Sequence, residues 1–335
     1  MNQKEIIQKT LLLNHHGQLN ESGYATKMNF VYNRDKARSF PFKLKEWNFY
    51  QFMKGDYVIQ MTIGHLSYAC SVTATLINLQ SGKKDSVSVM LWFFVPELDV
   101  DPELKSYCEF KYHNFMMSFQ VCEEERILSF KGSNKEYKNI DILLRVKNDV
   151  ANDKMVIATP FAKKHQFYLN YKENYYEAHG HVTFGETSVD FDGATGLLDW
   201  GRGVWPYKHE WFWGSVSTHL DGVPFGLNIG WGFGDLSNAT ENMYFYDKKA
   251  YKIGVLEVMR DKNDYMAPWH VIDQDGKLEF TFVPIFDNYT ENKYVVIDTH
   301  CHQVYGYFSG EIETPYGRKK FKDVLGFIEH AVNRW

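Results

Sequence analysis

The segment YVIQMTIGHL, residues 57–66, shows the pattern that decides the fold class. From Ile59 to Ile63, large apolar residues alternate with polar ones, as expected for a β-strand with two different faces. The same alternation recurs along most of the chain. The segments that we predict as strands are Tyr57–Leu66, Tyr68–Leu79, Val87–Val95, Phe110–Val121, Ile140–Lys147, Trp211–His219, Val223–Phe233, Met243–Tyr246, Tyr251–Met259, Leu278–Pro284, Tyr294–Thr299 and Gln303–Ile312.

Turn residues separate many of these segments and predict antiparallel hairpins. The clearest turns are Ser81-Gly82-Lys83, Asp192-Gly193, Asp221-Gly222, Asp275-Gly276 and Tyr316-Gly317. Helical periodicity is weak, and we predict one short helix over Gln3–Leu13. The strands are too many for one small barrel of about eight. We therefore predict an all-β protein with two antiparallel barrels or barrel-like sandwiches, divided into residues 1–155 and 156–335 near the polar stretch Asn148–Thr159.

The bulk composition excludes several classes of protein. The net charge of −5 argues against a nucleic-acid partner, and the one basic run, Arg318-Lys319-Lys320, is predicted to be a solvated hairpin tip. No stretch reaches the roughly 20 apolar residues of a membrane span, and residues 1–16 lack the apolar core of an export signal. We therefore expect a cytoplasmic protein. Its four cysteines are scattered and predicted to be reduced. No motif indicates a cofactor, and nothing indicates the oligomeric state.

Aromatic residues make up 17% of the chain and are concentrated in LDWGRGVWPYKHEWFW, residues 198–213. Such side chains line many ligand pockets. Arg202 lies between two glycines and two tryptophans, where it can stack on an indole and bind a carboxylate such as Asp199. This arrangement either orients a ligand at a pocket mouth or forms a structural ion pair. We place the block at a corner that leads into a strand of the second barrel.

Two further carboxylates compete as partners of Arg202. Glu46 opens a predicted strand next to Trp47, and Glu241 lies in the Thr240-Glu241-Asn242 segment. A buried carboxylate needs a partner or has a raised pKa, so either residue can also be an acid in an apolar pocket. The tentative catalytic residues are Asp199, Glu241 and Arg202. The predicted ligand-binding residues are Trp200, Trp205, Tyr207, Trp211, Trp213, Asn228, Glu46 and Trp47.

Histidines offer two weaker possibilities. His209 precedes Trp211 and is either a proton carrier near the pocket or an exposed residue at a strand start. Two H-x-H pairs, His179 with His181 and His300 with His302, would each present both imidazoles on one strand face, as β-barrel metal centres do. Thirteen histidines make such pairs common by chance, so we expect no metal.

Five sequence blocks resemble the marks of a bacterial family known as a domain of unknown function. They are Gly23-Tyr24-Ala25, Leu44–Tyr50 (LKEWNFY), Asp199–Tyr207 (DWGRGVWPY), Thr240–Asn242 (TEN) and Gly326–Trp335 (GFIEHAVNRW). The layout is more distantly similar to the double lipocalin-like superfamily, which contains AttH-like proteins, carotenoid hydratases of the hydroxyneurosporene synthase type, tocopherol cyclase and lipid carriers. The resemblance implies two lipocalin-like barrels with an apolar cavity near their interface.

These features lead to three hypotheses of different classes. The first is a protein that binds a small hydrophobic molecule, such as a lipid or isoprenoid, and it rests on the aromatic excess. The second is a hydratase or isomerase that performs acid–base chemistry on such a molecule, without a metal or nucleotide cofactor. The third is a carbohydrate-active protein in which paired carboxylates act on a glycosidic bond.

Overall fold

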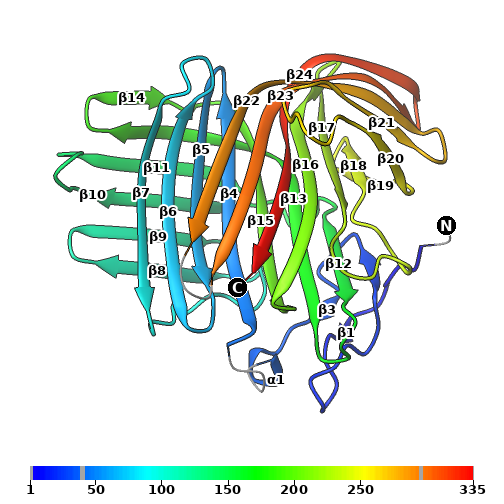
Figure 1. The fold of residues 1–335 in the computed structure, drawn as a ribbon, viewed down its shortest axis with the longest axis horizontal. Coiled ribbons are helices and arrows are strands. Elements are labelled where there is room, and N and C mark those ends of the chain that lie inside the picture. The colour runs from blue at the N-terminus through cyan, green and yellow to red at the C-terminus, as the bar shows by residue number, and fades with distance from the viewer. Residues whose placement is uncertain (1–2, 38–41, 294–296, 335) are drawn as a thin grey trace.

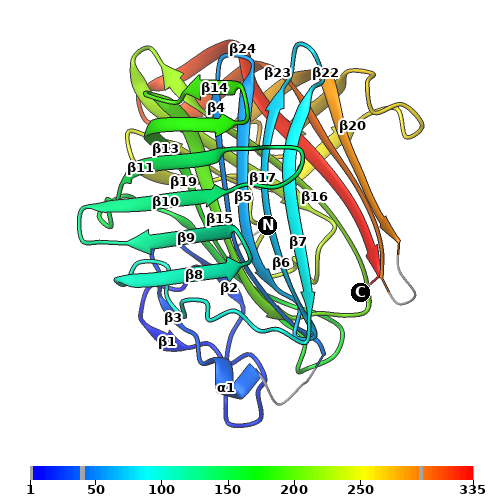
Figure 2. The same cartoon turned by 90° about the vertical axis from the view of Figure 1, so that its left-hand side faces the viewer.

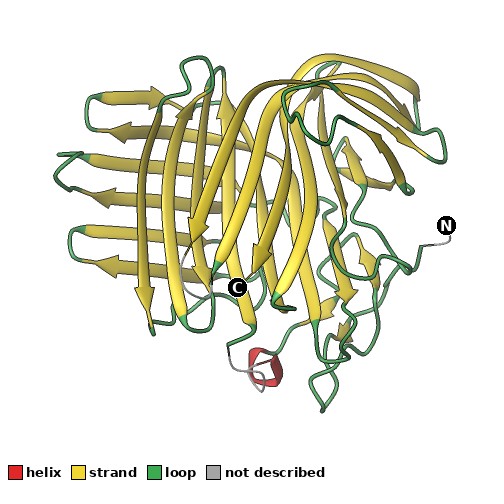
Figure 3. Ribbon diagram, viewed as in Figure 1, coloured by secondary structure: helices red, strands yellow, loops and turns green. Residues whose placement is uncertain are grey.

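β-Strands form nearly all regular structure in residues 3–37, 42–293 and 297–334, which are the residues that the computed structural model describes. Figure 3 shows strands almost throughout and, in the described part of the chain, one short helix, α1 (Arg34–Ala37). The prediction of an all-β protein is confirmed. The predicted helix over Gln3–Leu13 is wrong, because Thr10–Leu11 forms β1, which pairs in parallel with β3 (Phe30–Val31).

The first sheet contains thirteen of the described strands and is antiparallel. Its main path has the order β7-β6-β5-β4-β15-β13-β11-β10-β9-β8, and β12, β14 and β2 pair beside it. Figure 1 shows β8–β11 running across β4–β7, so the sheet curls over on itself. The strands are β2 (Gly23–Ala25), β4 (Leu44–Lys54), β5 (Tyr57–His65), β6 (Ala69–Asn78), β7 (Lys84–Trp92), β8 (Ser106–Tyr112), β9 (Phe115–Val121), β10 (Glu125–Gly132), β11 (Ile140–Lys147), β12 (Met155–Pro160), β13 (Phe167–Phe184), β14 (Thr187–Asp190) and β15 (Ala194–Val204).

The second sheet contains nine described strands in the order β19-β18-β17-β16-β24-β23-β22-β21-β20 and also curls. Its strands are β16 (Lys208–Leu220), β17 (Val223–Trp231), β18 (Met243–Tyr246), β19 (Lys249–Lys252), β20 (Leu256–Met259), β21 (Trp269–Asp273), β22 (Leu278–Lys293), β23 (Asp298–Thr314) and β24 (Gly317–Arg334). The predicted pair of barrel-like sheets is confirmed as two curled, antiparallel half-barrels.

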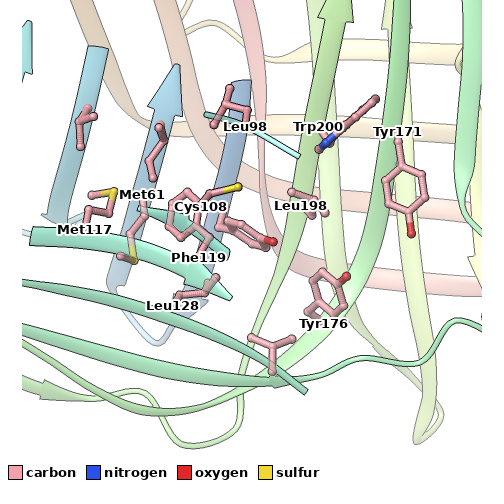
Figure 4. Packing of buried hydrophobic residues seen from close by; sticks show 14 of the residues in the cluster. Met61, Leu98, Cys108, Met117, Phe119, Leu128, Tyr171, Tyr176, Leu198 and Trp200 are labelled. Carbon is pink, nitrogen blue, oxygen red and sulfur yellow. The ribbon is translucent and has the colours of Figure 1, made fainter. Parts of the chain in front are cut away.

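Each half-barrel has its own apolar core, and a third cluster joins them. Figure 4 shows part of the first core, where Trp200 and Leu198 of β15 lie with Tyr171 and Tyr176 of β13. β22–β24 run beside β4–β6, and between them lies a cluster that includes Met53 from the first sheet and Phe327 from the second (Figures 1 and 2). β4, β15 and residues 167–174 of β13 therefore bury both of their faces, whereas Glu177 and His179 farther along β13 are exposed.

Two of the predicted strands needed correction, and a third lies partly outside the described residues. The segment Phe110–Val121 is a hairpin of two strands, because His113 adopts a left-handed φ of 50° between them. Tyr251–Met259 is likewise divided between β19 and β20. The predicted strand Tyr294–Thr299 includes residues 294–296, which lie outside the described residues.

The block at residues 198–213 joins the two sheets. β15 ends at Val204 in the first sheet, and β16 begins at Lys208 in the second. The first half of the block is therefore a central strand of the first sheet rather than part of the predicted corner, whereas residues 205–207 lead into a strand of the second sheet as predicted. Residues 156–204 also belong to the first sheet, although the division into domains at residue 155 stays a prediction.

No described helix is long and apolar enough to cross a lipid bilayer. The cytoplasmic location stays a prediction.

The packing of β15 against β4 leaves no room for a side chain at Gly201. A Cβ there would lie 2.0 Å from the Trp47 ring, whereas a Cβ at Gly64 would meet its nearest neighbour at 3.5 Å. We expect Gly201→Ala to lower the free energy of unfolding by about 1–3 kcal/mol, the usual cost of overpacking. Gly64→Ala is the matched control in a neighbouring strand. Urea unfolding of both variants checks this, and equal midpoints would contradict the packing of Trp47 on β15.

Candidate functional site

A cavity of about 270 Å³ lies where the two sheets meet. Its wall combines aromatic rings with several ionisable groups. The described lining residues are Glu46, Trp47, Phe49, Thr62, Gly64, Leu66, Ser71, Tyr168, Lys172, Asp199, Trp205, Trp211, Trp213, Phe233, Glu241 and Glu329. The volume is close to the lower end, about 300 Å³, of typical small-molecule sites.

The pleat of β15 decides which of its side chains reach this cavity. Successive side chains of a strand point to opposite faces. Asp199 and the α-carbon of Gly201 are on the cavity side, where Trp47 lies against Gly201. Trp200 and Arg202 are on the other side, inside the first half-barrel. The single stretch DWGRG thus serves two different environments.

Asp199 is held in place by two donors. The indole N–H of Trp47 donates to Oδ2 at 2.9 Å, and the amide of Asn170 donates to Oδ1 at 2.6 Å. Burial raises the pKa of Asp199 above its ordinary value, while Lys172 and both hydrogen bonds oppose the rise. Asp199 is therefore an oriented carboxyl whose ionised form is disfavoured by its apolar surroundings.

Glu329 on β24 brings a second oriented carboxyl from the other sheet. The indole N–H of Trp211 donates to Oε1 at 2.7 Å, and the Gln303 amide lies 3.3 Å from Oε2. Removal from water raises the pKa of Glu329 to about 7, and the nearby charge of Asp199 adds to the rise. Glu329 therefore exchanges a proton near neutral pH, as a general acid or base requires.

Lys172 and Glu241 form an ion pair in the same wall. Their Nζ and Oε2 atoms lie 2.5 Å apart, and the ammonium also lies 4.3 Å from the centre of the Trp213 ring. The amide of Asn228 accepts a hydrogen bond from the Trp213 indole and donates to the backbone carbonyl of Glu241. Asn228 therefore positions cavity residues rather than lining the cavity.

Hydrogen bonds to Thr240 and Asn242 fix the backbone on both sides of Glu241. The buried ammonium of Lys252 donates to Oγ1 of Thr240 at 3.0 Å and to the carbonyl of Asn242 at 2.5 Å. The Asn242 side chain accepts from the backbone N–H of Gly230 at 2.8 Å. A Cβ at Gly230 would lie 2.4 Å from the Glu241 carboxyl, so glycine is required where this side chain crosses β17.

Arg202 is fully buried and is not among the residues that line the cavity. It stacks on Trp200, with Cζ 3.9 Å from the ring centre, and donates to the backbone carbonyls of Trp47 and Asp99. Its expected partner Asp199 is on the opposite face of the strand, so that pairing is wrong. Glu46 lies 3.7 Å from its Nε, and the structure therefore favours the structural alternative for Arg202.

Glu46 is fully engaged by the same buried polar network as Arg202. Its carboxylate accepts hydrogen bonds from Tyr32 at 2.7 Å and Arg34 at 2.9 Å, and it lies 3.3 Å from His65. Burial alone would raise its pKa, but these partners and Arg202 lower it to about 2. Glu46 borders the cavity and remains ionised, so it is poorly suited to donate a proton there.

The sequence matches the family described as Domain of unknown function (DUF2804) over residues 3–335. The chain belongs to this family. No curated protein matches it. The fold is similar to the crystal structure of kievitone hydratase from Nectria haematococca, with a TM-score of 0.54, 11% identity and coverage of 97% of this chain and 98% of that one. It is also similar to a protein assigned as an AttH from Nitrosomonas europaea, with a TM-score of 0.45, 10% identity and coverage of 89% and 93%.

The aromatic residues that we predicted to bind a ligand contribute unequally to the cavity. Four of the predicted tryptophans line it, namely Trp47, Trp205, Trp211 and Trp213, whereas Trp200 belongs to the first core. Tyr207 lies outside, half exposed, on a neighbouring surface. These placements concern geometry, and the roles of the residues stay predictions.

Sequence reasoning missed several cavity residues of this DUF2804 protein. Tyr168, Lys172 and Phe233 carry no distinctive motif. Glu329 does have a signal, because it is the acid of the terminal block GFIEHAVNRW that marks the family. Its place at the end of the chain hid its proximity to Asp199, which only the contact of the two sheets creates.

None of the five histidines considered in the sequence analysis lines the cavity. His209 is buried beside Trp211, and burial lowers its pKa to about 4, so it is uncharged at neutral pH. The exposed position that we considered for it is wrong. His179 and His181 lie on β13, and His300 and His302 lie on β23 in the other sheet. Within the described ranges, no group of three or more His, Cys, Asp or Glu side chains is arranged to hold a metal ion.

Glu329 makes the stability depend on pH in a definite direction. Its pKa of about 7 exceeds the ordinary value of 4.5, so the native state binds the proton more tightly than the unfolded chain does. The free energy of unfolding should therefore fall by about 1–3 kcal/mol as the pH rises from about 4.5 to 7. Chemical unfolding across this range measures the slope.

Glu329→Gln should remove this contribution to the slope, whereas Glu257→Gln, at an exposed position on β20, should leave it in place. Identical pH profiles for wild type and Glu329→Gln would show that Glu329 titrates normally.

Proposed function

We propose that the cavity binds a small, largely apolar molecule and performs acid–base chemistry on it. The observation that carries the proposal is the placement of Asp199 and Glu329 in one aromatic cavity, each oriented by an indole N–H from Trp47 or Trp211. Apolar walls favour an apolar substrate and also disfavour ionised carboxyls. The same surroundings therefore bind the substrate and keep an acid protonated.

The arrangement supports hydration, or its reverse, at a carbon–carbon double bond. Glu329 in its acid form transfers its proton to one carbon of the double bond, and a cation develops at the other carbon. The faces of Trp211 and Trp213 stabilise positive charge. Water then adds to the cation, and its released proton passes to Asp199. Isomerisation uses the same first step, followed by loss of a proton from a neighbouring carbon.

The fold supports hydration as the first reaction to test. It is shared with a kievitone hydratase, whose name describes the addition of water to kievitone. At 11% identity this likeness concerns the fold, and the argument for chemistry rests on the cavity.

Lys172 has a separate part in this proposal. Its ammonium pairs with Glu241 and also favours the ionised form of Asp199. It therefore helps Asp199 act as the base while Glu329 acts as the acid. The two carboxyls differ in environment, which is the usual way in which a site separates an acid from a base.

The first experiment identifies the ligand. We expect native mass spectrometry of the protein purified from its own host to show a retained small molecule. That molecule, or its unsaturated precursor, is then the substrate for turnover assays. A molecule that is retained and never converted would favour the alternative that the protein is a carrier. The carbohydrate-active alternative also stays a prediction, and a retained glycoside would favour it.

Substitutions then separate binding from chemistry. We expect Glu329→Gln and Asp199→Asn each to lower kcat by about 10²–10⁴-fold, the usual contribution of acid–base catalysis. Ligand affinity should change little, because both substitutions preserve shape. Glu257→Gln is the control. Wild-type turnover in both cavity variants would refute the proposed acid and base.

A further inference from the structure

A second apolar hollow, which we call the aromatic shelf, adjoins the cavity. It has a volume of about 430 Å³ and is lined by Phe42, Lys43, Tyr68, Trp92, Phe93, Trp205 and Tyr207. Trp205 lines both the shelf and the inner cavity. The two spaces therefore share one residue of their walls.

Trp205 is well fixed as the boundary between them. It is 4% exposed and lies in edge contact with Trp47 at 5.0 Å, Tyr168 at 5.5 Å and Phe233 at 4.8 Å between ring centres. Such edge-to-face contacts add stability beyond simple burial. The wall that the cavity and the shelf share is therefore a rigid ring, which lets one ligand contact both spaces.

The chemistry of the shelf differs from that of the cavity. The cavity wall carries Asp199, Glu241 and Glu329, whereas the described shelf residues include no carboxyl, and Lys43 is the charged one among them. Trp92 stacks on Tyr68 with ring centres 6.1 Å apart. The shelf thus offers flat apolar surface and no carboxyl group among its described residues.

Two phenylalanines of the shelf are unusually exposed. Phe93 is 85% exposed and Phe42 is 64% exposed. Both have left-handed backbone, with φ of 60° and 67°, which bulky residues seldom adopt. The N–H of Phe93 donates to the carbonyl of Tyr68 at 2.7 Å, which fixes the turn after β7. The fold therefore presents these rings to solvent at the edge of the site.

From these observations we infer that the ligand has two parts and that the shelf binds the second one. The reacting part enters the inner cavity, which is too small for a large molecule, and an elongated apolar tail passes Trp205 and lies on the shelf. The substrate class is therefore an amphipathic molecule with an extended hydrocarbon tail. This inference rests on the proposed binding of an apolar ligand in the cavity.

Two fluorescent probes with the same head test the tail. They are 6-propionyl-2-(dimethylamino)naphthalene and its 6-dodecanoyl homologue, which are uncharged and differ only in acyl chain length. We expect the dodecanoyl probe to bind the wild-type protein at least tenfold more tightly. In the variant Phe42→Asn/Phe93→Asn, the dodecanoyl probe should bind no more than about threefold more tightly than the propionyl probe. The affinity of the propionyl probe itself should be unchanged.

Asparagine suits these positions because it tolerates left-handed backbone, so the variant should keep the fold. Tyr316→Ser is the control, because Tyr316 is 72% exposed at the β23–β24 turn and lines neither space. Tyr316→Ser should keep the full tail preference, which is the tighter binding of the dodecanoyl probe relative to the propionyl probe. A tail preference that survives in the shelf variant, or is lost equally in the control, would overturn the inference.

Two further outcomes distinguish this inference from the proposed function. Ser71→Phe narrows the inner cavity and should weaken binding of the propionyl probe at least tenfold. If the propionyl probe binds neither wild type nor variants, the proposed apolar-ligand function itself loses support. If the shelf variant instead loses binding to vesicles of phosphatidylcholine and phosphatidylglycerol and keeps the tail preference, the shelf docks on membranes and the inference is wrong.

Discussion

β4, β15 and the first half of β13 must bury both of their faces, because one face closes the first half-barrel and the other meets the second sheet or the cavity. This constraint separates neighbouring residues by function. Along β15, Trp200 and Arg202 complete the first core, while Asp199 faces the cavity. Glycine at position 201 then lets the Trp47 ring lie against the strand. The motif is dense because two environments are built from one strand.

The charged side chains are divided between the same two environments, the first core and the cavity. In the first core, Arg202 and Arg34 neutralise Glu46 and lower its pKa to about 2. In the cavity, Lys172 is engaged by Glu241, and the pKa of Glu329 rises to about 7. A buried site with more acids than bases holds a proton at neutral pH. The structural acid and the candidate catalytic acid are thus both glutamates, and they differ only in their neighbours.

Local sequence patterns predicted several strands with their correct bounds. Ile140–Lys147 and Met243–Tyr246 are confirmed at both ends. The hairpin at His113 was missed because no glycine marks it, and its left-handed backbone depends on the pairing of β8 with β9. The helix over Gln3–Leu13 was wrong because β1 instead pairs with β3.

By itself, the sequence determined the all-β class, the paired half-barrels and four tryptophans of the cavity wall, because two-residue alternation and motif composition are local properties. Only the tertiary structure decided which face of β15 borders the cavity and that Glu329 lies in the same cavity as Asp199. A side chain's face depends on strand register, and the meeting of distant residues depends on which sheet covers that face. Neither is encoded within a single segment of the chain.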